Sequence, residues 1–107
     1  MIKVRFTVGN RQLKGFEISG HAMYAASGSD VVCAAVSSAA YMAANTITDV
    51  VGADAVAQVE EASMCVKLNK PDEQAEIVLK GLELHLTELS KQYPQNIKII
   101  YGGVKNA

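Results

Sequence analysis

The stretch GHAMYAASGSDVVCAAVSSAAYMAAN, Gly20 to Asn45, decides the fold because it leads into a long run of small and apolar residues. This run predicts a helix that begins near Val31 and ends near Val51, with Gly52 as a C-terminal stop. The helix is apolar or small on nearly every side, which is typical of a helix buried on most sides. One sheet would cover only one of these sides, so a second helix or another subunit must cover the rest.

The residues before this helix predict a hairpin and a loop. Residues 2–8 alternate apolar and polar side chains, as a half-buried strand does. Gly9-Asn10 is a good two-residue turn, and a second strand should run to about Gly20. Residues 21–29 are expected to form a loop, because they end in Ser-Gly-Ser, and Asp30 or Ser29 should cap the helix.

The residues after the helix predict three more elements and a return strand. Residues 55–70 should form two short strands around a turn near Glu61-Ala62. A second, amphipathic helix opens at Pro71-Asp72, and the last strand runs from Ile97 to Tyr101. The expected order is ββαββαβ, an α+β fold with one mixed sheet and two main helices in a layered sandwich. We expect residues 1–107 to form a single domain.

Composition and charge exclude several classes of function. The 107 residues carry a net charge of −1, which does not favour a general binder of nucleic acid or of membrane surfaces. No apolar run approaches the roughly 20 residues that span a bilayer, and no signal peptide is evident, so we expect a cytoplasmic protein. The two cysteines are expected to be thiols. The histidines and cysteines lie in separate segments, so we expect no metal and no cofactor.

The residues from Gly20 to Ser37 suggest nucleophilic chemistry. If the helix begins near Val31, Cys33 lies in its first turn, where unpaired N–H groups and the helix dipole stabilise a thiolate. His21 could take the thiol proton and later protonate a leaving amine. Asp30 could orient that imidazole or cap the helix, and Ser37, one turn after Cys33, could donate a hydrogen bond.

Each of these residues also has a structural interpretation. A single Cys near a helix start is usually a small core residue, and His21 alone is more often a hydrogen-bonded residue at a strand end. Asp30 alone is most often an N-cap, and Ser37 alone is most often a packing residue. Spacing alone therefore does not establish catalysis.

The motif GHAMYAASGSDVVCAAVS, Gly20 to Ser37, closely resembles the signature of the ribosomal-processing cysteine protease family. That signature is a Gly-His-Ala opening, a glycine-containing loop, and then Asp-[Ile/Val]-Val-Cys-Ala-Ala-Val-Ser at a helix start. Every element of it is present here. The resemblance also covers the length of the chain and the expected order of its elements.

The resemblance implies a cysteine endopeptidase that removes an N-terminal extension from a large-subunit ribosomal protein, the twenty-seventh, by cutting after an aromatic pair. It implies Cys33 as the nucleophile and His21 as its base, with Asp30 and Ser37 as supporting residues. It also implies a homodimer, and a mobile loop between His21 and Cys33 that admits the substrate. Met23 and Tyr24 should line the substrate pocket, with Gly28 giving the loop its freedom.

Two other functions compete with this one. A non-catalytic ribosome-associated binding factor is suggested by basic residues on the expected strands, which could meet RNA if they share one face. They are Lys3, Arg5, Lys14, Lys67 and Lys98. A solvated sheet face is the simpler explanation, so direct nucleic-acid binding is not expected. A thiol redox protein is disfavoured because no resolving Cys lies near Cys33.

Overall fold

An N-terminal hairpin lies at the centre of the sheet, and it forms because its strands alternate apolar and polar residues. The computed structural model describes residues 1–20 and 27–103, with side chains from 27 to 30 outside the described part. Strand β1 spans Ile2–Gly9 and β2 spans Gln12–Ser19. The turn lies at Asn10 and Arg11, whose φ angles are 52° and 64°. The predicted turn at Gly9-Asn10 is therefore wrong by one residue, because both central residues of this turn need positive φ.

The first helix, α1, spans Ser27–Asn45 and continues as a π-helical segment, η1, over Thr46–Val51. Gly52 ends it in the left-handed conformation with φ of 70°, as expected. The start differs from the prediction, because α1 begins one turn before Val31. Serine and glycine cost a helix only about 0.5–1 kcal/mol each relative to alanine, so a long helix can extend through them.

The remaining elements follow the predicted order. Strands β3 and β4 span Ala55–Glu60 and Ser63–Leu68, and α2 spans Glu73–Gln92. The Asp72 carboxylate accepts a hydrogen bond from the Ala75 backbone N–H at 2.9 Å and so caps α2. The last strand, β5, spans Ile97–Gly103, slightly longer than expected.

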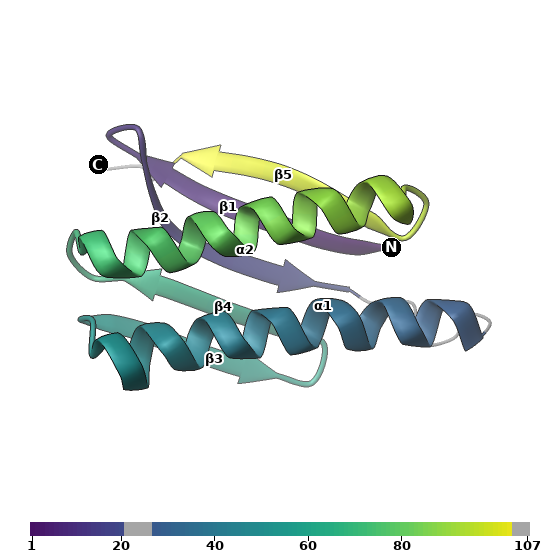
Figure 1. Ribbon diagram of the computed structural model, residues 1–107, viewed down its shortest axis with the longest axis horizontal. Coiled ribbons are helices and arrows are strands. Elements are labelled where there is room, and N and C mark those ends of the chain that lie inside the picture. Colours follow the sequence, from purple (N-terminus) through teal and green to yellow (C-terminus); the bar gives the residue numbers. More distant parts are fainter. Residues whose placement is uncertain (21–26, 104–107) are drawn as a thin grey trace.

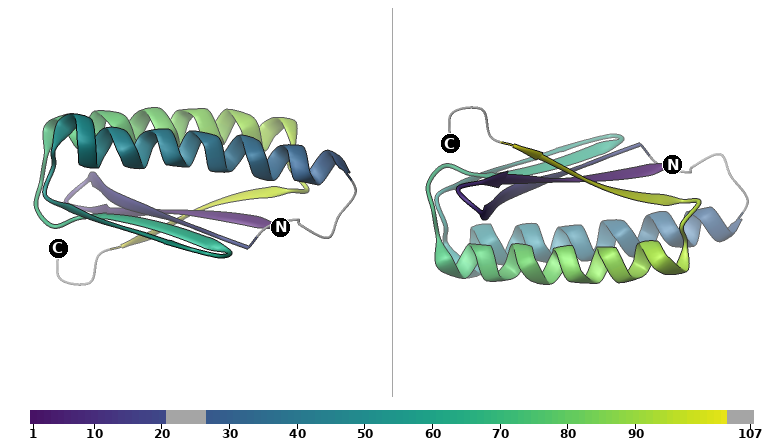
Figure 2. Two further views of the ribbon diagram at one scale, coloured as in Figure 1. Left: turned by 90° about the horizontal axis from the view of Figure 1, so that it is seen from below. Right: turned by 90° about the horizontal axis from the view of Figure 1, so that it is seen from above.

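The five strands form one mixed sheet in the order β3-β4-β2-β1-β5. All neighbours are antiparallel except β1 and β5, which are parallel. Both helices lie on one face of this sheet and run side by side (Figures 1 and 2). The predicted α+β class, order and two-layer arrangement are confirmed.

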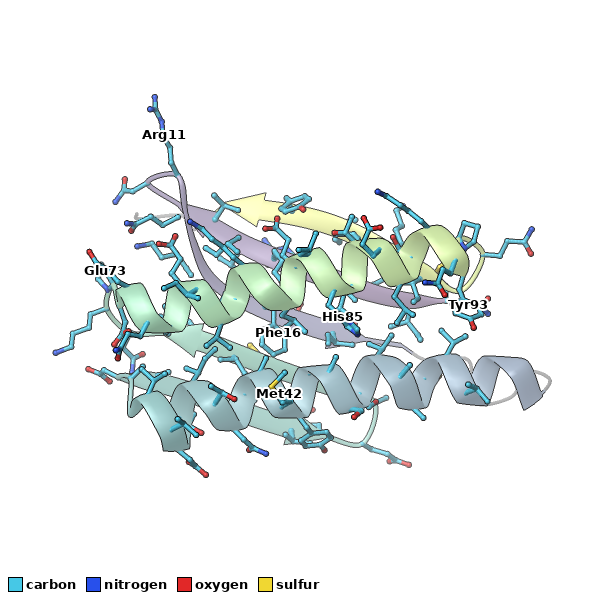
Figure 3. All side chains as sticks on the ribbon, viewed as in Figure 1. Arg11, Phe16, Met42, Glu73, His85 and Tyr93 are labelled. Atoms are coloured by element: carbon cyan, nitrogen blue, oxygen red, sulfur yellow. The ribbon has the colours of Figure 1, made fainter. Side chains whose placement is uncertain are left out.

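The core fills the space between the sheet and the two helices. Its largest fully buried side chains are Phe6, Phe16, Ile2, Ile47, Leu79, Leu86, Val4, Val32, Val36 and Val66. Figure 3 shows Phe16 of β2 behind the two helices. The α2 N-terminus is tied to the sheet, because the Glu76 carboxylate accepts a hydrogen bond from the Leu13 N–H at 3.1 Å.

Residues Val31–Val51 have the length and apolar composition of a membrane-spanning helix, with a mean hydropathy of 1.4. The expectation that no apolar run approaches this length is therefore wrong. The core helix of a globular protein has the same composition, and one side of this segment is packed in the core. That side comprises Val32, Val36, Ala40, Ala43, Ala44 and Ile47.

Candidate functional site

Cys33 and Ser37 line one pocket of about 200 Å³, which lies between α1 and the β3–β4 turn. The pocket draws residues from three parts of the chain. Helix α1 supplies Cys33, Ser37, Ala40 and Tyr41; the end of β2 supplies Ile18 and Gly20; and the β3–β4 hairpin supplies Val59, Glu60, Glu61, Ala62, Ser63 and Met64. Sheet order explains this meeting, because β4 pairs with β2 and brings the hairpin turn beside the end of β2.

The helix geometry aligns Cys33 and Ser37 on one face. Residues four apart are neighbours on a helix surface, so Cys33, Ser37 and Tyr41 follow one another along α1. Cys33 is half-buried, and Tyr41 remains 45% exposed. Because α1 begins at Ser27, Cys33 lies in the second turn, and the expectation that it lies in the first turn is wrong. The N–H groups that lack an intrahelical partner at the helix start therefore belong to earlier residues.

The other predicted site residues fall at or beyond the limit of the described part. His21, Met23 and Tyr24 lie outside the described residues, and so does the Asp30 side chain. The backbone of Asp30 and Gly28 belongs to α1, so neither the predicted cap at Asp30 or Ser29 nor the predicted loop at Gly28 is correct.

Gly20 connects β2 to the residues that carry His21. It lines the same pocket as Cys33, and it immediately precedes His21 in the chain. Its φ is 71°, and a Cβ there would lie 2.7 Å from the Met1 carbonyl oxygen. A side chain at this position would therefore strain the backbone of residue 20 and clash with the backbone of Met1. Glycine thus allows the direction that the chain takes after β2.

Sequence reasoning missed the contributions of Tyr41 and of the hairpin. Tyr41 carries a usable signal, because it follows Cys33 by eight residues and so shares its helix face. Val59, Glu60 and Met64 carry no such signal, because their position depends on the order of strands in the sheet. Glu60 and Glu61 are exposed and place negative charge at the edge of the pocket.

Cys65 lies on the opposite, helix-free face of the sheet. It is the cross-strand partner of Glu17. Burial raises the pKa of the Cys65 thiol, the Glu17 carboxylate raises it further, and Lys67 partly offsets both. Neither Cys65 nor Cys33 is in a disulfide, as predicted. In the ranges 1–20 and 31–103, no three His, Cys, Asp or Glu side chains are placed to hold a metal ion.

Four of the five basic residues noted on the strands share this helix-free face. Lys3 is the cross-strand partner of Lys98, and Arg5 that of Glu17. Lys67 lies on the same face of β4 as Cys65. Lys14 is elsewhere, beside the N-terminus of α2.

Comparison with known proteins identifies relatives of the whole fold. The family model described as cysteine protease Prp matches residues 1–98. The ribosomal processing cysteine protease Prp of Bacillus subtilis (strain 168) is 23% identical over 97 residues, which cover 84% of this chain and 87% of that protein.

Solved structures show the same fold. SMU.848 from Streptococcus mutans is 26% identical and superposes with a TM-score of 0.87, covering 97% of this chain and 96% of that one. The essential ribosomal processing protease Prp from S. aureus, in complex with a substrate peptide, gives a TM-score of 0.86 at 21% identity. That comparison covers 95% of this chain and 100% of the other.

Proposed function

Because the chain belongs to the Prp family of ribosomal processing cysteine proteases, we propose that it is a cysteine endopeptidase acting on a ribosomal protein precursor. The proposed substrate is the large-subunit ribosomal protein that is twenty-seventh in the usual naming. The cut removes its N-terminal extension after an aromatic pair. The observation that carries this proposal is the shared pocket of Cys33 and Ser37, bordered by the residue that precedes His21.

The proposed chemistry assigns a role to each residue. His21 accepts the Cys33 proton, and the thiolate attacks the scissile carbonyl carbon. The imidazolium then protonates the leaving amine, and water hydrolyses the thioester that remains. Ser37, one turn from Cys33, donates a hydrogen bond to the thiolate or the substrate, and Asp30 supports the site.

The segment between His21 and α1 is proposed to admit the substrate. Met23 and Tyr24 line the pocket from this segment, in addition to Ile18, Met64 and Tyr41 from the described residues. Gly28, which was expected in this segment, lies in the first turn of α1 that follows it.

The experiment is cleavage of a peptide that carries the aromatic pair and the residues after it. Cys33→Ala should abolish cleavage without loss of the folded circular dichroism spectrum, because no other group replaces the nucleophile. Cys65→Ala, on the opposite face of the sheet, is the matched control and should cleave normally. His21→Ala should lower kcat by about 10²–10⁴-fold. Cleavage by Cys33→Ala at the wild-type rate would refute the assignment.

We also propose that the protein is a cytoplasmic homodimer. Helix α1 leaves apolar side chains exposed on the side away from the sheet, including Val31 and Met42 at 64% and 66%. A second copy would cover them.

A second candidate function, a ribosome-associated binding factor, rests on the basic side chains of the helix-free face. Lys3, Arg5, Lys67 and Lys98 share this face with Glu17. If they meet RNA, the Cys33→Ala protein should bind a ribosomal RNA fragment in a salt-sensitive way, and Lys3→Glu should weaken that binding. Peptide cleavage without RNA binding would leave the endopeptidase as the function.

A further inference from the structure

Strand β3 leaves one edge of the sheet open beside the candidate site. It is the terminal strand of the order β3-β4-β2-β1-β5, and no strand in the described part of the chain pairs with its outer edge. Figure 1 shows β3 at the border of the sheet, with α1 in front of it. Its backbone groups on that edge are available to another chain.

The register shows which residues of β3 direct their backbone groups outward. The Asn69 N–H donates to the Asp54 carbonyl at 2.8 Å, just beyond the end of the β3–β4 pairing. Antiparallel pairs alternate between bonded and non-bonded residues, and β3 pairs with β4 without a register shift. Val56, Gln58 and Glu60 therefore bond to β4, and the N–H and C=O groups of Ala55, Ala57 and Val59 point outward.

Strand β3 carries few of the features that protect sheet edges from pairing. Its sequence, AVAQVE, contains no Lys, Arg or Pro, and a charge appears only at its last residue. The opposite edge strand, β5, carries Lys98 and ends in two glycines. Val56 and Val59 are 45% and 55% exposed, so the open edge is also apolar.

The run of β3 residues whose backbone groups point to the open edge reaches the pocket of Cys33. Ala57 and Val59 are cross-strand partners of Val66 and Met64, which are buried under the helices. In a strand added beside β3, every second side chain would therefore point to the α1 side of the sheet, as those of Ala57 and Val59 do. Val59 and Glu60 line the pocket, so a strand along β3 leads into it.

From this continuity we propose that the open edge of β3 docks the peptide substrate as an added strand. The backbone of an extended peptide pairs with Ala55, Ala57 and Val59. Alternate side chains then face α1, and one of them enters the pocket that holds Cys33. Main-chain pairing of this kind supplies affinity, and the pocket supplies specificity. The inference rests on the proposed peptidase function, because it names how that substrate is held.

The first test scans the backbone of the substrate peptide with N-methyl groups. Strand pairing predicts a period of two: methylation of every second amide should lower kcat/KM by about three- to tenfold or more, because each removes one hydrogen bond. The intervening amides should tolerate the methyl group and provide the internal control. Equal sensitivity at consecutive amides, or none, would overturn the proposal without any change to the protein.

The second test removes an outward N–H from β3. Ala57→Pro deletes that donor but no β3–β4 bond, and proline is tolerated on strand edges that face solvent. Its kcat/KM should be about three- to tenfold below that of Ala57→Ser, which keeps the N–H. Circular dichroism melting of both variants checks the fold. If the proline variant does not fold, the N-methyl scan alone tests the proposal.

The outcomes separate this inference from the function on which it rests. If the wild-type protein does not cleave the peptide, the proposed function fails. If cleavage is normal but neither test has an effect, only the docking strand is overturned. If Ala57→Pro converts a dimer to a monomer in sedimentation and leaves kcat/KM unchanged, the edge binds a second copy, which also overturns the proposal.

Discussion

At the scale of single residues, the two cysteines differ in their surroundings. Cys33 lines a pocket on the helix side of the sheet with Ser37, whereas Cys65 lies on the helix-free face beside Glu17 and Lys67. Burial and the Glu17 carboxylate both disfavour the Cys65 thiolate, which is the reactive form. The described surroundings of Cys65 therefore disfavour its activation.

Alkylation of Cys65 should be slow at neutral pH. Because its pKa is raised, the thiolate is scarce at neutral pH, and the rate should keep rising as the pH passes the ordinary thiol value. Glu17→Gln removes one cause of the shift, so it should lower the pKa and speed the reaction at pH 8. The measurement is the intact mass during iodoacetamide treatment of the Cys33→Ala protein, where only Cys65 can react. An unchanged rate in Glu17→Gln would contradict the assigned cause.

The sequence predicts which residues of α1 share a helix face, but it does not predict which strands lie beside that face. The pairing of Cys33 with Ser37 follows from helical spacing, and the structure places both in one pocket. The contribution of Val59 and Met64 depends on which strand lies beside β2, and no local pattern encodes that order. The roles of His21, Asp30, Met23 and Tyr24 stay predictions.

At the scale of elements, α2 is the clearest case of a pattern that fixes a structure. Its apolar residues recur at helical spacing, and Ala75, Leu79, Leu82 and Leu86 are buried as that spacing predicts. Asp72 provides the cap that the Pro71-Asp72 start indicates. Stability should therefore depend on one face of α2 and very little on the other.

Leu79→Ala should destabilise the protein by about 2–5 kcal/mol, because Leu79 is completely buried and its loss leaves a cavity. Leu84→Ala, on the same helix but 65% exposed, is the matched control and should change stability by less than about 0.5 kcal/mol. Urea unfolding followed by circular dichroism gives both values. Similar losses in the two variants would mean that the face at Leu84 is covered, for instance by a partner.

Element boundaries were less predictable than element types. The first turn lies at Asn10 and Arg11 because Arg11 adopts a positive φ, which arginine rarely does. Helix α1 begins at Ser27 because the small cost of Ser and Gly is not enough to stop a long helix. Both errors arise where the local conformational preference of a residue is weak and the surrounding structure determines its conformation.

At the scale of the whole molecule, a groove of about 720 Å³ separates α1 and α2 on the side away from the sheet. Its walls include Ala39 and Met42 of α1 and Val78 and His85 of α2. Figure 3 shows Met42 and His85 on the two helices that border it. The sequence predicts that one sheet cannot cover α1, and the structure shows the uncovered side next to this groove.

The proposed homodimer should be sensitive to Met42. Met42→Lys places a charge on the exposed side of α1, so it should shift sedimentation from dimer to monomer at micromolar concentration. Leu84→Lys introduces the same charge on an exposed position of α2 and serves as control, with the dimer retained. A wild-type monomer throughout this range would refute the dimer, and a dimeric Met42→Lys protein would move the interface elsewhere.

The parallel pairing of β1 with β5 links the first of the described strands to the last. During synthesis β1 emerges before the other described strands and pairs with β2 within a hairpin, but its other edge stays open until β5 emerges. Pairs so far apart in sequence close a large loop and form slowly compared with hairpins and helices. Of the five described strands, the earliest to emerge is therefore the last to be fully paired. Until then the nascent chain exposes an unpaired strand edge in what becomes the interior of its sheet.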